Sequence, residues 1–124
     1  MNISELLARN ARKFPNKIAI IDGDVSFSYQ EVDDTVNRLA SSLASLGITQ
    51  GDKVVLYMPN TKEFVYAYFA VLRLGAIIVP VHARLTAQEV QYIIEHSEAK
   101  AVIAHDWIYE ELASLVHTCL LYTS

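Results

Sequence analysis

The sequence is poor in cysteine, and it contains no block of basic residues. Cys119 is the only cysteine among the 124 residues, so no disulfide can form within the chain. This usage is typical of a reducing cytoplasm. The formal net charge is -4, without a run of lysine or arginine, and this excludes the basic footprint of a nucleic-acid-binding protein. We therefore expect a cytoplasmic protein that binds no nucleic acid.

No segment meets the requirements of a secretory signal or a transmembrane helix. The chain begins without an apolar signal core, and Glu5 lies early in it. The longest apolar stretch covers residues 64–81, but Arg73, Gly75 and Pro80 interrupt it. A membrane span needs about 20 mostly apolar residues. With 52% hydrophobic and 19% charged residues, the chain has the composition of a packed globular domain.

Common nucleotide and metal motifs are also missing. No Gly-x-Gly-x-x-Gly follows an apolar run, and no Gly-x-x-x-x-Gly-Lys-Ser/Thr occurs, so neither common phosphate cradle is present. The histidines lack the close spacing of metal ligands; they are His82, His96, His105 and His117. We predict no metal site in these 124 residues.

What the sequence does contain is a regular order of helix and strand signals. An apolar stripe at helical spacing predicts a first helix that ends at Pro15 and that Asn2 can cap. Two short apolar runs around Asp22-Gly23-Asp24 predict a β-hairpin. Capping boxes open two later helices, with Ser28 and Glu31 in one and Thr86 and Glu89 in the other.

A further helix is expected between these two. Asn60, with Glu63, is predicted to cap it, and Gly75 to end it, as Gly47 ends the helix before it. Continuous apolar runs predict a strand at 54–58 that is covered on both faces, another buried strand at 76–80 and a third strand at 101–104. Their alternation with helices predicts a parallel sheet.

The predicted fold is therefore α/β: a three-layer-like partial parallel sheet with flanking helices and an N-terminal β-hairpin. Asp106 is expected to cap a last helix that runs to Val116. Beyond it we expect no closing element. We interpret residues 1–116 as one partial subdomain and residues 117–124 as a doubtful tail, of the kind that a truncation or assembly error would produce.

Four polar residues qualify as site candidates on position alone. Ligands of open α/β sheets bind beyond the carboxyl ends of the strands. The residues that follow predicted strands there are His82, Arg84, His105 and Asp106. Each has a structural alternative, as a helix cap, a solvated loop residue or a partner in a local hydrogen bond. No catalytic residue is predicted.

An aromatic cluster lies on the middle helix. Phe64, Tyr66, Tyr68 and Phe69 would suit the wall of an acyl pocket, but an apolar helix of this kind favours core packing.

Several segments together resemble the opening of the adenylate-forming (AMP-binding) superfamily, which includes acyl-CoA synthetases, aryl-CoA ligases and luciferases. The segments are ARKFPNKIAII, SYQEVD, LGITQGDKV, MPN, LGAIIVPV and LTAQEVQYIIEHSEAKAVIA, in the family's order and spacing. The likeness covers about residues 1–116. It implies the opening part of an acyl-CoA-synthetase N-terminal domain. The compact opening looks more like a bacterial fatty-acyl or aryl-acid CoA ligase than the acetyl branch.

The resemblance also implies an activity. Such enzymes join a carboxylic acid to ATP, with Mg2+ and a lysine, and the CoA-ligase branches pass the acyl group to CoA. The family's phosphate loop, ribose-binding Asp and C-terminal Lys have no counterpart in this sequence. ATP, Mg2+ and CoA are thus expected for the full-length parent, with the remaining domains missing here, and no cofactor for these 124 residues, which we expect to be inactive alone. Where the family commonly has Asn-Pro, this chain has His82-Ala83.

Two other readings of the sequence stay open. The chain could be a free-standing α/β module that binds a small anion at its strand ends, although it lacks a phosphate loop. It could instead be a structural interaction protein whose sheet edge pairs with another chain.

Overall fold

The computed structural model describes residues 3–104 and 120–123, and these residues form four helices and six strands. The helices are α1 (Ile3–Lys13), α2 (Tyr29–Ser45), α3 (Lys62–Arg73) and α4 (Ala87–Ser97). The strands are β1 (Ile18–Asp22), β2 (Val25–Ser28), β3 (Lys53–Tyr57), β4 (Ile77–Val81), β5 (Ala101–Ala104) and β6 (Leu120–Thr123). No described helix is long and apolar enough to cross a membrane.

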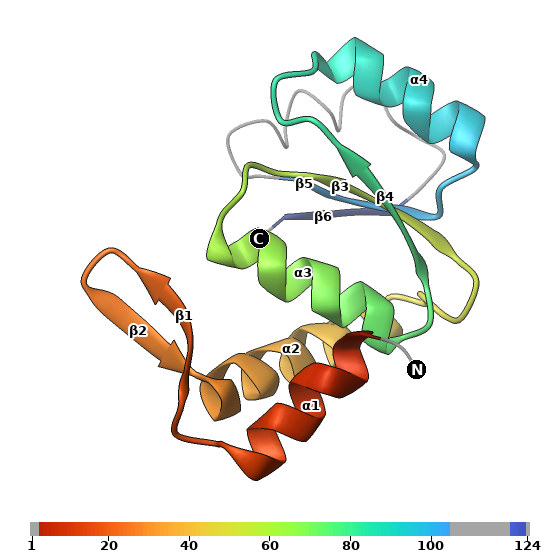
Figure 1. Ribbon diagram of the computed structural model, residues 1–124. Helices are drawn as coiled ribbons and strands as arrows, with labels where there is room; N and C mark the ends of the chain where they lie inside the picture. Colours follow the sequence, from red (N-terminus) through yellow and green to blue (C-terminus); the bar gives the residue numbers. More distant parts are fainter. Residues whose placement is uncertain (1–2, 105–119, 124) are drawn as a thin grey trace.

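Four of the strands form one parallel sheet, in the order β4-β3-β5-β6. Helices α1, α2 and α3 lie on one side of this sheet and α4 lies on the other, as Figure 1 shows. The remaining strands, β1 and β2, form an antiparallel hairpin that extends away from the body. The predicted α/β fold, with a three-layer arrangement and an N-terminal hairpin, is confirmed.

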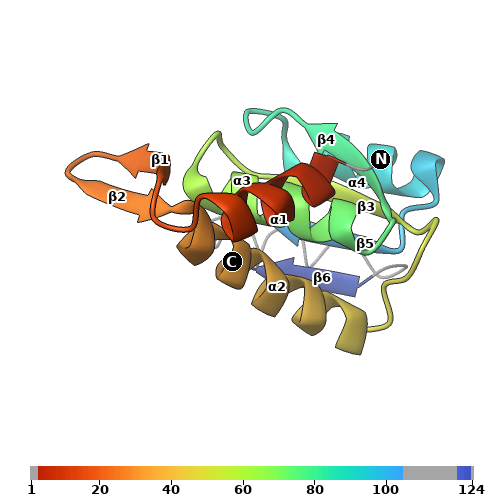
Figure 2. The same ribbon diagram turned by 60° about the horizontal axis from the view of Figure 1, so that its bottom comes forward.

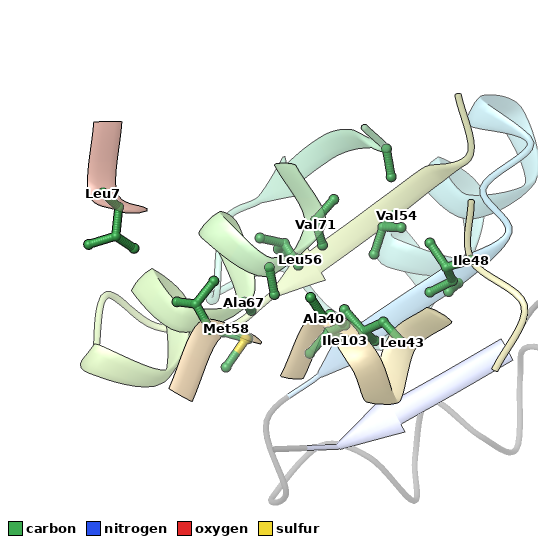
Figure 3. Close-up of a cluster of buried hydrophobic side chains, with 14 of the residues drawn as sticks. Leu7, Ala40, Leu43, Ile48, Val54, Leu56, Met58, Ala67, Val71 and Ile103 are labelled. Carbon is green, nitrogen blue, oxygen red and sulfur yellow. The ribbon is translucent and has the colours of Figure 1, made fainter. Parts of the chain in front are cut away.

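The alternation of side chains along the strands builds two separate cores. Val54 and Leu56 of β3 point to the side of α2 and α3, where they join Ile103 of β5. Figure 3 shows these side chains meeting Leu43 and Val71 from the two helices. On the opposite face, a second cluster packs against α4; its strand members are Val55, Tyr57, Val81, Val102 and Ala104. Burial of both faces explains why these strands are continuously apolar.

Local hydrogen bonds set the helix ends largely as predicted. Both capping boxes form, at Ser28 with Glu31 and at Thr86 with Glu89. Gly75 follows the end of α3 with φ +73°, a conformation that favours glycine. The cap predicted for α3 is wrong by one residue. Thr61, not Asn60, is the N-cap, because its hydroxyl oxygen accepts a hydrogen bond from the Phe64 amide three residues on.

Two predictions about the strands are also wrong. The strand predicted as buried at 76–80 is β4, which lies at an edge of the sheet, so Ile77 is half exposed and Pro80 is tolerated there. An element does follow the last predicted helix: Leu120–Thr123 form β6, which pairs with β5. The predicted helix that Asp106 would cap, and the Asn2 cap, lie outside the described residues.

The turn between α2 and β3 is held by a network around Asp52. Its carboxylate accepts a hydrogen bond from the Thr49 amide at 2.8 Å and lies 3.3 Å from the Lys100 ammonium. Lys100 also donates to the Gly47 carbonyl at 2.6 Å, so it ties the end of α2 to the start of β5. The hydrogen bond that Asp52 accepts from the Thr49 backbone amide, together with the nearby Lys100 ammonium, lowers the pKa of Asp52 below its ordinary value.

This network predicts how acid affects stability. Because the folded-state pKa of Asp52 is depressed, its stabilising contribution is present above the ordinary pKa of about 4 and is lost as pH falls through the folded value. We expect Asp52→Asn, which retains an oxygen acceptor for Thr49, to flatten the loss of stability between neutral and acid pH. Urea unfolding at several pH values would measure this. If the variant lost as much free energy of unfolding on acidification as the parent chain, the prediction would be contradicted.

A second polar network joins the three helices on one side of the sheet. The Arg73 guanidinium on α3 donates to the Ser4 hydroxyl on α1 at 2.7 Å and to the Asn37 side-chain oxygen on α2, also at 2.7 Å. Its Nη1 lies 2.9 Å from the Asp33 carboxylate, and both side chains are largely buried. Ser4 is itself buried. Arg73 therefore fixes how α1 and α2 sit against α3.

Removal of this guanidinium should be costly. Arg73→Ala leaves Asp33 without its counter-ion and Ser4 without this donor, and we expect a loss of about 2–3 kcal/mol in the free energy of unfolding. Arg38→Ala is the matched control: Arg38 is exposed on α2 and donates to the Thr35 hydroxyl at 3.3 Å, so its loss should cost under about 0.5 kcal/mol. Urea unfolding compares the two; equal losses would contradict the prediction.

Candidate functional site

The carboxyl edge of the parallel sheet carries two of the four predicted site residues. His82 and Arg84 follow β4, in the loop that leads to α4, and both are exposed. The Arg84 amide donates to His82 Nδ1 at 3.1 Å, so one ring nitrogen already serves a local turn. The other two candidates, His105 and Asp106, lie outside the described residues. The structure thus brings His82 and Arg84 together, in a role that is at least partly structural.

A buried tyrosine anchors this loop, and the sequence interpretation missed it. Tyr57, at the end of β3, donates its hydroxyl hydrogen to the Leu85 carbonyl. The ring is almost fully buried in the core under α4. A tyrosine among the aliphatic residues of VVLYM was the available signal, since a buried phenol needs a polar partner.

The described part of this edge does not fit Mg2+ or a triphosphate. Among residues 3–104 and 120–123, no three histidine, cysteine or acidic side chains gather as metal ligands. The loop after β3 is Pro59-Asn60, without a glycine that would let backbone amides approach a phosphate. Arg84 is the cation of the β4 loop, and it is exposed.

A cleft lies elsewhere, between β1 of the hairpin and the first turn of α3. Its volume is about 490 Å³, within the range of small-molecule sites. The lining residues come from two segments: Ile20, Ile21 and Asp22 of β1, and Asn60, Thr61, Lys62, Phe64 and Val65 at the start of α3. Sequence reasoning did not find this cleft, because 40 residues separate its two walls at Asp22 and Lys62.

The charges in this cleft are already paired with one another. The Lys62 ammonium lies 3.1 Å from the Asp22 carboxylate and 3.1 Å from that of Glu63. The hydrogen bond to Glu63, and then that to Asp22, raise the pKa of Lys62 above its ordinary value. Lys62 therefore stays a cation and bridges the hairpin to α3, while the rest of the cleft is mainly apolar.

The aromatic residues of α3 pack mainly on the core. Phe64, Tyr66, Tyr68 and Phe69 are half-buried against the cluster between the sheet and α2. The Phe64 and Tyr68 ring centroids lie 6.0 Å apart, as do those of Tyr68 and Phe69. Burial raises the pKa of the Tyr66 phenol. The predicted packing role is confirmed. Of these four residues, Phe64 alone also lines the cleft between β1 and α3.

The Tyr57 anchor can be tested by proteolysis. Tyr57→Phe keeps the ring but removes the donor to the Leu85 carbonyl, so the β4–α4 loop should open more often. We expect faster trypsin cleavage after Arg84, measured by mass spectrometry under native conditions. Tyr92→Phe is the control, because Tyr92 is exposed on α4. Equal cleavage rates in the two variants would count against the anchor.

Comparison with known proteins agrees with this fold. The AMP-binding enzyme family matches residues 7–122. The chain is 35% identical over 103 residues to a crotonobetaine/carnitine–CoA ligase of Escherichia coli O1:K1; the match covers 77% of this chain and 20% of that protein. The chain thus spans about a fifth of the length of the curated relatives that it matches.

Solved structures extend the likeness over nearly the whole chain. The N-terminal domain of FACL13 from Mycobacterium tuberculosis, bound to an inhibitor, superposes with a TM-score of 0.89 at 31% identity, covering 99% of this chain and 33% of that one. A benzoate CoA ligase from Burkholderia xenovorans LB400 superposes with a TM-score of 0.89 at 29% identity. This match covers 100% of this chain and 26% of the ligase. Since the family match spans most of the sequence and the fold agrees, the chain belongs to the AMP-binding enzyme family.

Proposed function

We propose that the chain is the opening part of an ATP-dependent carboxylate–CoA ligase. The observation that carries this proposal is the family match over residues 7–122. Several proteins similar to the chain are named as CoA ligases, among them the carnitine and benzoate enzymes. The whole enzyme would form an acyl-adenylate from an acid and ATP and then transfer the acyl group to CoA.

The acid would be a fatty or an aryl acid. Support comes from the likeness to the benzoate ligase and to a Mycobacterium tuberculosis fatty acyl CoA synthetase, which is 32% identical with a TM-score of 0.86. The single cysteine supports a reducing, cytoplasmic setting. The boundary expected at residue 116 stays a prediction, which genomic sequence downstream of codon 116 would test.

The role proposed for these 124 residues is that of a scaffold. The carboxyl edge of the described sheet has no side-chain set that fits Mg2+-ATP, and no phosphate loop occurs in the sequence. His82 and Arg84 remain candidates for contact with a ligand at that edge. We propose that the chain alone is inactive.

Activity assays test the scaffold role. We expect the purified 124 residues to show no ATP–pyrophosphate exchange above background with any fatty or aryl acid. A fusion in which this chain replaces the matched 26% of the Burkholderia benzoate ligase should regain benzoate-dependent exchange. The same ligase without any replacement for that segment is the control. Exchange by the isolated chain, or an inactive but folded fusion, would contradict the proposal.

Calorimetry separates the alternative of a free-standing binding module. Under the proposal, ATP, AMP and CoA should each bind the isolated chain more weakly than the micromolar range. Micromolar binding of any of them would favour the module.

A further inference from the structure

Helix α1 carries a surface whose charge is opposite to that of the chain as a whole. Arg9, Arg12 and Lys13 stand against the single acid Glu5, which leaves the helix with a net charge of +2. All four residues are exposed. The formal net charge of the whole chain is -4, so α1 departs from the rest of the molecule. We call Arg9, Arg12 and Lys13 the basic patch.

Helix α4 carries the opposite charge. Glu89 and Glu95 lie on the helix, Glu98 directly follows its last residue, and all three are exposed. We call these three residues the acidic patch. Glu95 and Glu98 lie at the carboxyl-terminal end of α4, where the helix dipole disfavours negative charge. The helix itself gains nothing from these two carboxylates, whereas a cation placed beside them would be stabilised.

Neither patch is neutralised within the described part of the chain. The ion pairs among residues 3–104 and 120–123 have Lys62, Arg73 or Lys100 as their cation, and no member of either patch takes part in them. The Glu89 carboxylate accepts a hydrogen bond from the Thr86 amide at 3.0 Å, which leaves its charge in place. Exposed charges of opposite sign on one molecule attract those of another when they are not paired internally.

An apolar hollow accompanies the acidic patch. Tyr92 is 62% exposed and lies between Glu89 and Glu95 on α4. It lines an open hollow of about 560 Å³. The other lining residues are Leu85, Gln88, Glu89 and Ile93. A small ligand needs a site that buries most of its surface. A hollow whose largest ring stays this exposed therefore suits a side chain of another protein better.

Leu6 supplies an apolar group beside the basic patch. It is 44% exposed. Leu6, Arg9 and Lys13 are spaced three and four residues apart along α1, which places them on one face of the helix. Each helix thus presents an exposed apolar side chain next to charged ones, and the sign of the charge differs between the two helices.

We propose that the exposed face of α1 docks on the exposed face of α4 in a second copy of this chain. The occupant follows from charge complementarity. Two α1 faces repel each other, and so do two α4 faces, whereas α1 and α4 meet with opposite charges. In this contact Leu6 covers the hollow beside Tyr92, and the basic patch faces the acidic patch.

The positions of the two helices decide which assembly the contact forms. Figure 1 shows α1 and α4 on opposite sides of the parallel sheet, and Figure 2 shows α1 at the front with α4 behind it. Two rigid copies therefore cannot make the contact twice with each other. Such a head-to-tail contact continues to a third copy and beyond. A single pair of helices buries less than a standard interface, so the association is weak and depends on concentration.

Sedimentation equilibrium of the 124-residue chain tests this contact. At about 0.01 M salt, where the Debye length is about 30 Å, we expect the weight-average mass to rise with protein concentration past the mass of two chains. At about 1 M salt the Debye length is about 3 Å, and most of this rise should disappear. This measurement needs no variant, so it tests the contact even if a substituted chain fails to fold.

Charge reversal identifies the two faces. Arg9→Glu with Lys13→Glu reverses the charge of the α1 face, and Glu95→Lys with Glu98→Lys reverses that of the α4 face. Each double variant should lower the association constant about tenfold or more, because like charges then meet. A chain with all four substitutions has opposite charges on the two faces again. Its association constant should return to within about fivefold of that of the parent chain.

A control variant separates the local contact from the effect of net charge. Arg38→Glu with Lys53→Glu makes the same change in net charge as the α1 double variant, at exposed residues of α2 and β3. It should leave the association constant within about twofold of that of the parent chain. The melting temperature of each variant, measured at high salt, shows whether it is folded.

Three outcomes would overturn the inference. The first is a parent chain that stays monomeric at low salt or whose mass does not respond to salt. The second is a limiting mass of two chains, since the head-to-tail contact does not stop at a pair. The third is a folded chain with all four substitutions that associates no better than the two double variants. Mass is the readout throughout, so the result is independent of the activity assays that test the proposed function.

Discussion

Burial of both faces of the central strands is the constraint on which the rest of the structure depends. β3 and β5 place one set of aliphatic side chains under α2 and α3 and the alternate set under α4. No polar side chain fits at these positions unless it finds a partner, and Tyr57 meets that requirement through the Leu85 carbonyl. This burial goes with parallel strands, because consecutive parallel strands are joined by crossover helices, and these helices cover the faces of the sheet.

Polar contacts fix the geometry that apolar packing leaves free. Three helices on one side of a sheet can slide or tilt with little change in buried area. The Arg73 guanidinium removes that freedom, because its donors meet Ser4 on α1 and Asn37 on α2 with defined directions. Lys100 does the same at the other end of α2, where it reaches the Gly47 carbonyl and Asp52. These contacts together fix how α1, α2 and α3 sit on the sheet.

The distribution of functional features over this scaffold is uneven. The carboxyl edge, where open α/β sheets bind ligands, holds local hydrogen bonds at His82 and a tyrosine anchor, but no described group of metal or phosphate ligands. Exposed large apolar side chains occur on the hairpin, and also on α1, β4 and α4. The scaffold role that we propose rests on this description of the carboxyl edge.

The sequence by itself determined the features that depend on neighbours along the chain. The capping boxes at Ser28 and Thr86 join groups three residues apart, and the hairpin turn needs a glycine at position 23, so local chemistry was sufficient. The alternation of apolar strands with capped helices likewise predicted a parallel sheet, and the joint order of the motifs predicted the family. Even here the α3 cap was misplaced, since Asn60 and Thr61 are both suitable residues and only the backbone geometry chose between them.

Only the tertiary structure decided which strand lies at an edge, where the clefts lie and which charges meet. The apolar run that contains Ile77 and Pro80 predicted a buried strand. In the sheet, β4 pairs only with β3 among the described strands, so it lies at an edge and Ile77 is half exposed. Arg73 and Ser4 are 69 positions apart, and Tyr57 and Leu85 are 28 apart. Such contacts arise when helices and strands pack together, and no periodicity within a single element encodes them, because each partner is also a plausible surface residue until the other is placed beside it.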